Sequence, residues 1–401
     1  MKTISKQAEQ DALFRTIVCD FSFPDVTDSG EKVWQPSKFS FELLFYRMLA
    51  DEALFEALRK SKGLTYVFEK TLTEISIRQE SPAGRLFYQW IAHAVFPEPP
   101  AKYELSPESM LLNNNARQLG LNAARFSSQP DPMGLAIGAS HNVLQGELID
   151  SFGCRVFEVM QRAAFKEASK ARQKEIQSAI SKTERYFGRL ENNSPYLGIQ
   201  RFELHYRPDP SVSISIQENA KHLDSLIAML QERDGLGGFV GYWWKRRYLP
   251  ETGLGIHLIL LTDMEKIEPM AWASRQTPEI WKQVTNGQGV ACELIDVGAV
   301  GNHRCWGARK INIANASYSS LAEVLKSIRF MQESEKYLRL EPHPKIAHWG
   351  MGELPKAVIR TVAWQDSGQV EPPVQVKSPF DVAKNIESVP PLPESPKVPG
   401  A

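Results

Sequence analysis

The spacing of apolar positions predicts a helical first half of the chain. Apolar residues recur at close to 3.6-residue intervals from 39 to about 95 and again from about 137 to 190, the period of an amphipathic helix. Gly153 marks an expected break in the second stretch. We therefore predict a mainly α-helical domain over residues 39–190, after a loosely ordered lead-in over residues 1–38.

The second half alternates between strand-like and helix-like segments, beginning after the turn-forming run Asn192-Asn193-Ser194-Pro195. This alternation predicts an α+β domain over residues 195–356 with an antiparallel sheet. The order β-α-β-β-α-β is that of a ferredoxin-like sandwich, and two helices on one face of such a sheet would leave the other face open. The expected strands cover residues 197–206, 239–248, 256–261 and 289–297, and the expected helices cover 218–233, 278–284 and 318–337.

Residues 366–401 differ in composition from the rest of the chain. They are rich in proline, polar and poor in aromatic residues, which predicts a disordered or polyproline-like tail rather than part of a core. Protein partners could dock on such a tail.

One histidine stands in the most strongly apolar part of the second half. His257 is the polar exception in the run Ile256–Leu261, so we expect it on a central strand of the sheet. A rigid histidine beside a basic strand suits a metal or phosphate site. The alternative is a hydrogen-bonded core histidine without a ligand.

The neighbouring strand carries an aromatic residue beside three consecutive cations. Because side chains alternate along a strand, Trp243, Lys245 and Arg247 should share one face and Arg246 should lie on the other. An aromatic residue beside cations on an open sheet could bind single-stranded nucleic acid. The alternative is a buried tryptophan and a basic triplet that anchors the strand end.

A local excess of positive charge lies in the second helical stretch. Between Arg155 and Arg189 there are nine Lys and Arg residues against four Asp and Glu residues. Four of the cations stand four residues apart, so they line one helical face that could follow a phosphate backbone or remain a solvated face with local glutamate partners. These cations are Arg162, Lys166, Lys170 and Lys174.

Composition limits the remaining classes of function. The formal net charge is zero, so a nucleic-acid surface must be local. The four cysteines form no CxxC pair, and no segment approaches the roughly 18 apolar residues of a membrane span. We expect reduced thiols, a cytoplasmic location and no special role for His303, His343 or His348, which lie in loop-like segments.

Four stretches in order support a family resemblance: GIQRFELHYRPD, GYWWKRRY followed by GIHLILLTD, SIRFMQESEKYLRLEP and HWGMGELP. With them, residues 196–356 resemble the rolling-circle replication proteins of the HUH endonuclease superfamily that are associated with filamentous phages and integrated elements. The resemblance implies a His-hydrophobic-His pair that binds Mg²⁺ or Mn²⁺, a tyrosine nucleophile on a following helix, and DNA as partner. The metal polarises the scissile phosphate and the tyrosine oxygen forms a phosphotyrosine bond.

The catalytic positions of that family are altered in this chain. Gly255-Ile256-His257 replaces the histidine pair, Arg247 stands where a carboxylate is common, and Phe330-Met331-Gln332-Glu333 covers the tyrosine position. His257 is then the remaining candidate metal ligand. Tyr337 lies about two helical turns beyond Phe330 and is either a substitute nucleophile or a structural aromatic residue.

Three hypotheses follow from these patterns. The first is a DNA-binding protein related to rolling-circle initiators with reduced or lost nicking activity. The second is an active nicking endonuclease that uses His257 and Tyr337. The third is a protein-interaction scaffold of a mobile element, in which the sheet only supports docking surfaces.

Overall fold

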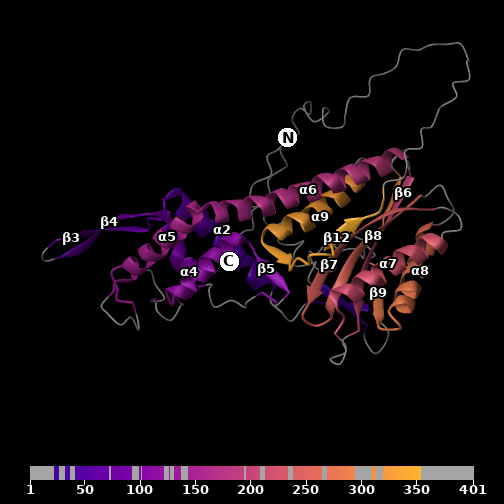
Figure 1. Ribbon diagram of the computed structural model, residues 1–401, viewed down its shortest axis with the longest axis horizontal. Coiled ribbons are helices and arrows are strands. Elements are labelled where there is room, and N and C mark those ends of the chain that lie inside the picture. Colours follow the sequence, from indigo (N-terminus) through magenta and orange to yellow (C-terminus); the bar gives the residue numbers. More distant parts are fainter. Residues whose placement is uncertain are drawn as a thin grey trace, which may run out of the picture. The chain divides into compact units, whose positions relative to one another are not determined.

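The computed structural model describes most of the chain between residues 22 and 353 (Figure 1). The predicted tail over residues 366–401 lies outside the described residues. The described ranges are 22–26, 32–36, 41–71, 74–92, 99–100, 102–121, 126, 131–136, 143–193, 196–207, 213–233, 238–263, 269–293, 309–312 and 319–353.

The first half contains two hairpins besides its helices. Strands β1 (Ser22–Val26) and β2 (Lys32–Pro36) pair within the region expected to be loosely ordered. Strands β3 (Tyr66–Lys70) and β4 (Ile75–Glu80) pair where continuous helix was expected, so that prediction was wrong. The helical period ends at Lys62 and Gly63, which both have positive φ. The residues that follow include β-branched and aromatic side chains, which are enriched in strands.

Five helices described in this half bury a shared aromatic and aliphatic core that includes Phe87, Trp90 and Phe152. The break between the last two falls at Arg162, not at Gly153. Gly153 lies inside the helix before this break. Glycine is required there because a Cβ would lie 2.3 Å from the carbonyl oxygen of Gly63. The helices are α2 (Phe41–Lys60), α3 (Pro82–Ala92), α4 (Pro107–Gln118), α5 (Gln145–Gln161) and α6 (Ala163–Asn193).

The second half is built on an antiparallel sheet with the order β10-β6-β8-β7-β12, in which β9 also pairs with β6. Strand β8 lies between β6 and β7, so the expected central position of His257 is confirmed. The mixed helix and antiparallel-sheet class is confirmed as well. The strands are β6 (Tyr196–Tyr206), β7 (Phe239–Leu249), β8 (Gly253–Asp263), β9 (Gly289–Glu293), β10 (Arg309–Asn312) and β12 (Trp349–Met351).

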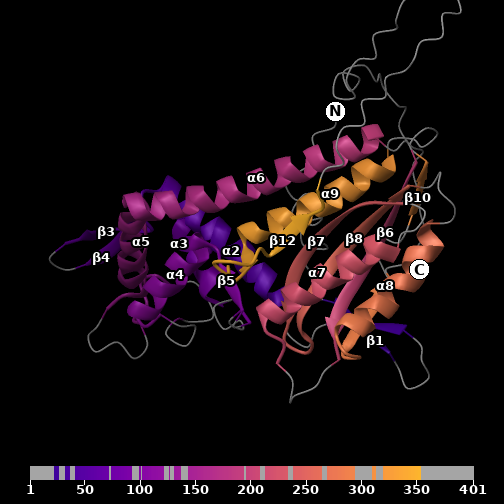
Figure 2. The ribbon, with the colours of Figure 1, turned by 45° about the vertical axis from the view of Figure 1, so that its right-hand side comes forward.

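Helices cover both faces of this sheet. Helices α7 (Ile216–Arg233) and α8 (Pro269–Val284) pack on one face. Helix α9 (Ser319–Glu333) and the second half of α6 run side by side over the other (Figures 1 and 2). The face expected to be open is therefore closed, because its row of Trp243, Ile259 and Leu261 needs an apolar cover.

The last segment of the second half returns to the first. Strand β11 (Leu338–Leu340) pairs with β5 (Tyr103–Leu105). The hydroxyl of Tyr103 donates to the carbonyl of Tyr248 at 3.0 Å and accepts from its amide at 2.9 Å. All described residues belong to one compact unit. None of the described helices is long and apolar enough to cross a membrane.

Candidate functional site

Three charged or polar side chains form a row across the central strands. In the β6–β8 pairing Glu203 lies opposite His257, and in the β7–β8 pairing His257 lies opposite Lys245. Directly opposite residues on antiparallel strands point to the same face. This face is the one that α9 and α6 cover.

The imidazole of His257 is held at both ring nitrogens. Its Nδ1–H donates to Oε1 of Glu203 at 2.5 Å, and its Nε2 accepts a hydrogen bond from Nε of Arg201 at 3.2 Å. These partners assign the neutral Nδ1–H tautomer. The lone pair on Nε2, which a metal ion would need, is directed at a guanidinium.

Arg247 completes this cluster from the neighbouring strand. Its guanidinium forms an ion pair with Oε2 of Glu203 at 2.8 Å, and both side chains are buried. Arg247 lies opposite Gly255, where a Cβ would lie 3.1 Å from the carbonyl of Leu204 and 3.7 Å from the arginine side chain. A Cβ at position 255 would therefore be crowded by the Leu204 carbonyl and would lie in ordinary contact with Arg247.

Glu203 remains ionised in this setting. Burial is the largest effect on its pKa and raises it, but Arg247, His257 and Arg201 together lower the pKa below its ordinary value. A buried carboxylate with these neighbours is stable as an anion only while the cations remain in place.

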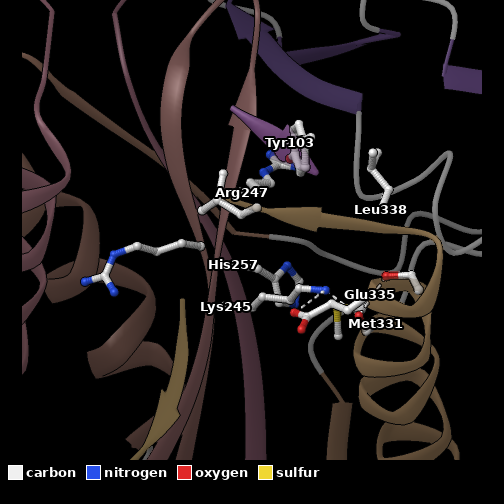
Figure 3. A pocket seen from close by; sticks show the side chains of 10 residues that line it. Tyr103, Lys245, Arg247, His257, Met331, Glu335 and Leu338 are labelled. Atoms are coloured by element: carbon white, nitrogen blue, oxygen red, sulfur yellow. Dashed lines mark hydrogen bonds and ion pairs between the residues drawn. The ribbon is translucent and has the colours of Figure 1, made fainter. Parts of the chain in front are cut away.

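A second buried pair lies beside the first. Lys245 pairs with Glu335 at 3.3 Å, and Glu335 accepts a hydrogen bond from Nε2 of His348 at 3.1 Å. Figure 3 shows Lys245, His257 and Glu335 pointing toward one another. Burial again raises the pKa of the glutamate, but Lys245 and His348 lower it to about 2.

The cavity that these residues line is small. It has a volume of about 30 Å³ and is bordered by Lys245, Arg247, His257, Met331 and Glu335, among others (Figure 3). Such a volume holds a water molecule and is far too small for a nucleotide. The Lys245 ammonium also donates to the carbonyl of Met331, which ties it to the end of α9.

These residues do not fit a divalent metal ion. Glu203 and His257 are occupied by each other and by two guanidinium groups, which are cations and cannot ligate Mg²⁺ or Mn²⁺ in any ordinary way. Among the described residues, no three His, Cys, Asp or Glu side chains are placed to hold a metal together. The metal-ligand role expected for His257 is not supported by this geometry.

Tyr337 is placed for a structural role. Helix α9 ends at Glu333 and a short 3-10 turn (Ser334–Lys336) follows, so Tyr337 does not lie on the helix with Phe330 as expected. Its hydroxyl donates to Oε2 of Glu52 at 2.8 Å. Burial and the charge of Glu52 raise the pKa of Tyr337, which opposes formation of the nucleophilic phenolate.

The predicted platform on β7 is not exposed. Trp243 is fully buried against α6 and α9. Arg246 lies on the opposite face, as expected, where Nε donates to Oδ1 of Asn219 at 2.8 Å and the guanidinium lies 4.4 Å from the centre of the Trp244 ring. Burial lowers the pKa of Arg246 to about 10.

The cations predicted on the long helix have the opposite environment. The side chains of Arg162, Lys166, Lys170 and Lys174 are exposed. The expected single face of four cations was wrong, because Arg162 caps the end of α5 with an extended backbone and only the three lysines form a row along α6. Lys166 donates to Gln161 at 3.0 Å, and no ion pair involves any of the four within the part of the chain that the structure describes. Local glutamates therefore do not neutralise this row, which we call the α6 row.

Sequence reasoning did not identify Glu203, Arg201, Glu335 and His348 as members of the charged cluster. The alternation Arg201, Glu203 along β6 was a usable signal, since it places both residues on one face. His348 was expected to have no special role. Its pairing with Glu335 depends on a chain return that no local pattern indicates.

Comparisons of the chain with protein-family models, with curated proteins and with solved structures found no match.

Proposed function

We propose that this protein is a DNA-binding protein related to rolling-circle replication initiators, in which the fold is kept and the nicking chemistry is lost. The element order β6-α7-β7-β8-α8-β9 and the neighbour order β9-β6-β8-β7 support a ferredoxin-like core of the HUH type. The four sequence stretches described above support the same relation.

One observation carries the proposal. Where the resemblance would put a metal ion and a nucleophile, the sheet holds a buried cluster in which Glu203 pairs with Arg247 and Glu335 with Lys245. The arginine and the lysine place positive charge on the face where a metal ion would otherwise balance the carboxylates. The cluster stabilises the packing of α9 on the sheet and offers no reactive group to DNA.

Binding is assigned to the exposed cations of α6. The α6 row has no carboxylate partners among the described residues, so its charges are available to phosphates. Each phosphate contact releases condensed counterions, which favours binding at low salt. Protein partners of the predicted tail form the competing explanation, in which the chain acts as a scaffold.

The test combines a nicking assay with a binding assay. The protein is incubated with labelled single-stranded DNA and Mn²⁺ or Mg²⁺, and a denaturing gel is examined for a covalent adduct while filter binding measures affinity. We expect DNA binding without an adduct. An adduct that disappears in Tyr337→Phe would establish the active-enzyme alternative, and absence of binding at every salt concentration would contradict the proposal.

A further inference from the structure

A second concave surface lies between the last turns of α6 and the sheet edge formed by β12. We call it the α6–β12 groove. Its volume is about 310 Å³, about tenfold more than that of the buried cavity. It is lined by Lys182, Arg185, Tyr186, Arg189, Met351 and Gly352.

Three of these six residues are exposed cations. Lys182, Arg185 and Arg189 follow the spacing i, i+3, i+7, which places them on one helical face. Arg185 donates through Nε to the carbonyl of Ser181 at 3.2 Å. No carboxylate of the described residues forms an ion pair with any of the three, in contrast to Lys245 and Arg247 on the sheet.

The floor of the groove is rigid. Tyr186 is buried, and its hydroxyl accepts a hydrogen bond from the amide of Tyr242 on β7 at 3.0 Å. The helix approaches the strand this closely because residue 241 is glycine, where a Cβ would lie 2.3 Å from the Tyr186 hydroxyl. The amide of Gly352 donates to the carbonyl of Tyr242 at 2.9 Å, which fixes the opposite wall.

We propose that the α6–β12 groove binds consecutive phosphates of a nucleic-acid strand. The three cations span about 10 Å along the helix at 1.5 Å per residue. At roughly 3.4 Å of rise per nucleotide of one strand, that length covers about three steps between consecutive phosphates. Half of the residues that line this concave surface are exposed cations and none of them is acidic, which suits a polyanion better than an acidic side chain alone. The groove also continues the α6 row toward the end of the same helix.

This inference rests on the proposed DNA binding and names the place where the strand is held. It goes beyond the resemblance, because the three cations of the groove lie on a helix that precedes the resembling residues. The experiment compares two matched triple variants of the full-length protein, each of which removes three exposed charges from α6. Lys182/Arg185/Arg189→Gln removes the groove cations and Lys166/Lys170/Lys174→Gln removes the α6 row.

Fluorescence anisotropy with a labelled single-stranded 20-mer and with its duplex is measured at several salt concentrations. We expect the groove variant to lose more affinity than the row variant. The magnitude of its slope of log affinity against log salt should fall by about 2 on the single strand, because each lost phosphate contact contributes about 0.7 to that slope. Circular dichroism confirms that both variants are folded. As an independent variant, Glu353→Gln removes a carboxylate next to Gly352 and should tighten binding.

The outcomes separate the proposed DNA binding from the proposed role of the groove. If the parent protein binds neither DNA, the proposed function fails and the groove with it. If the parent binds and the groove variant binds equally well while the row variant does not, DNA binding stands and the groove proposal is overturned. Equal losses in both variants would also overturn it, because they would show diffuse attraction to the whole helix.

Discussion

The molecule contains two groups of cations that look alike in sequence and differ completely in environment. On the sheet, Lys245 and Arg247 are buried and each faces a glutamate from another element. On α6, Lys166, Lys170 and Lys174 are exposed, and no ion pair to them is present among the described residues. The cations of the first group are neutralised inside the fold, so a ligand can be bound only by exposed cations such as those of α6.

The difference shows what decides the role of a basic residue. Removing a charge from water is costly, so buried cations persist only with anionic partners. Those partners, Glu203 and Glu335, come from β6 and from the turn after α9. An exposed cation has no such requirement, and its effect on stability is small.

The largest expected effect comes from removing the carboxylate of the buried group. Glu203→Gln keeps the side-chain size but leaves Arg247 and Arg201 without their anion, so unfolding by urea should show a loss of about 3–5 kcal/mol. Glu175→Gln removes the partner of Arg339 from an exposed pair at 2.9 Å and should cost under about 1 kcal/mol. Equal losses of unfolding free energy in the two variants would contradict the claim that buried and exposed ion pairs differ in their contribution to stability.

A pH dependence should come from Glu335. Its folded-state pKa of about 2 lies below the ordinary value of 4.5, so its stabilising contribution is fully present above about pH 4.5 and is lost as the pH falls toward 2. The contribution is on the order of 3 kcal/mol. The difference in unfolding free energy between the parent and Glu335→Gln should therefore shrink over this window. A difference that stays constant would show that Lys245 and His348 do not hold the ionised form.

Tyr337→Phe should have a moderate effect. The change removes the hydroxyl that donates to Glu52, while Lys336 still pairs with that carboxylate at 2.8 Å. Chemical denaturation should show a loss of about 1 kcal/mol, with DNA affinity unchanged. A DNA-cleaving activity that this variant abolishes would reverse the assignment of the residue.

The smallest effect on stability is expected for the α6 row. Lys166/Lys170/Lys174→Gln changes exposed side chains, and each change should alter the free energy of unfolding by no more than about 0.5 kcal/mol. DNA affinity should nevertheless fall in a titration at low salt. Marked destabilisation without any change in affinity would place these residues with the buried group.

Local patterns predicted the parts of the fold that depend on neighbouring residues. The hairpin of β7 and β8, the central position of His257 and the opposite faces of Lys245 and Arg246 follow from alternation and turn residues. The β3–β4 hairpin was missed because an apolar period over α2 was extended past the turn at Gly63.

The site could not be assembled from the sequence because its partners come from distant positions. Glu203 meets His257 through the register of β6 and β8, which lie 54 residues apart at this pair. Glu335 meets Lys245 only because α9 covers the sheet face that we expected from the sequence to be open. Long-range register of this kind leaves no local signal, so the basic triplet of β7 looked available to a ligand.

The most direct test of the account is the DNA affinity of a variant in which both exposed groups are removed together, Lys166/Lys170/Lys174/Lys182/Arg185/Arg189→Gln. Anisotropy with a single-stranded 20-mer at low salt is measured beside circular dichroism and thermal unfolding. The account predicts a folded protein that no longer binds DNA, with its buried cations still in place. Retained affinity in this folded variant would contradict the assignment of binding to α6 and would indicate that DNA contacts other basic residues, such as those of the sheet.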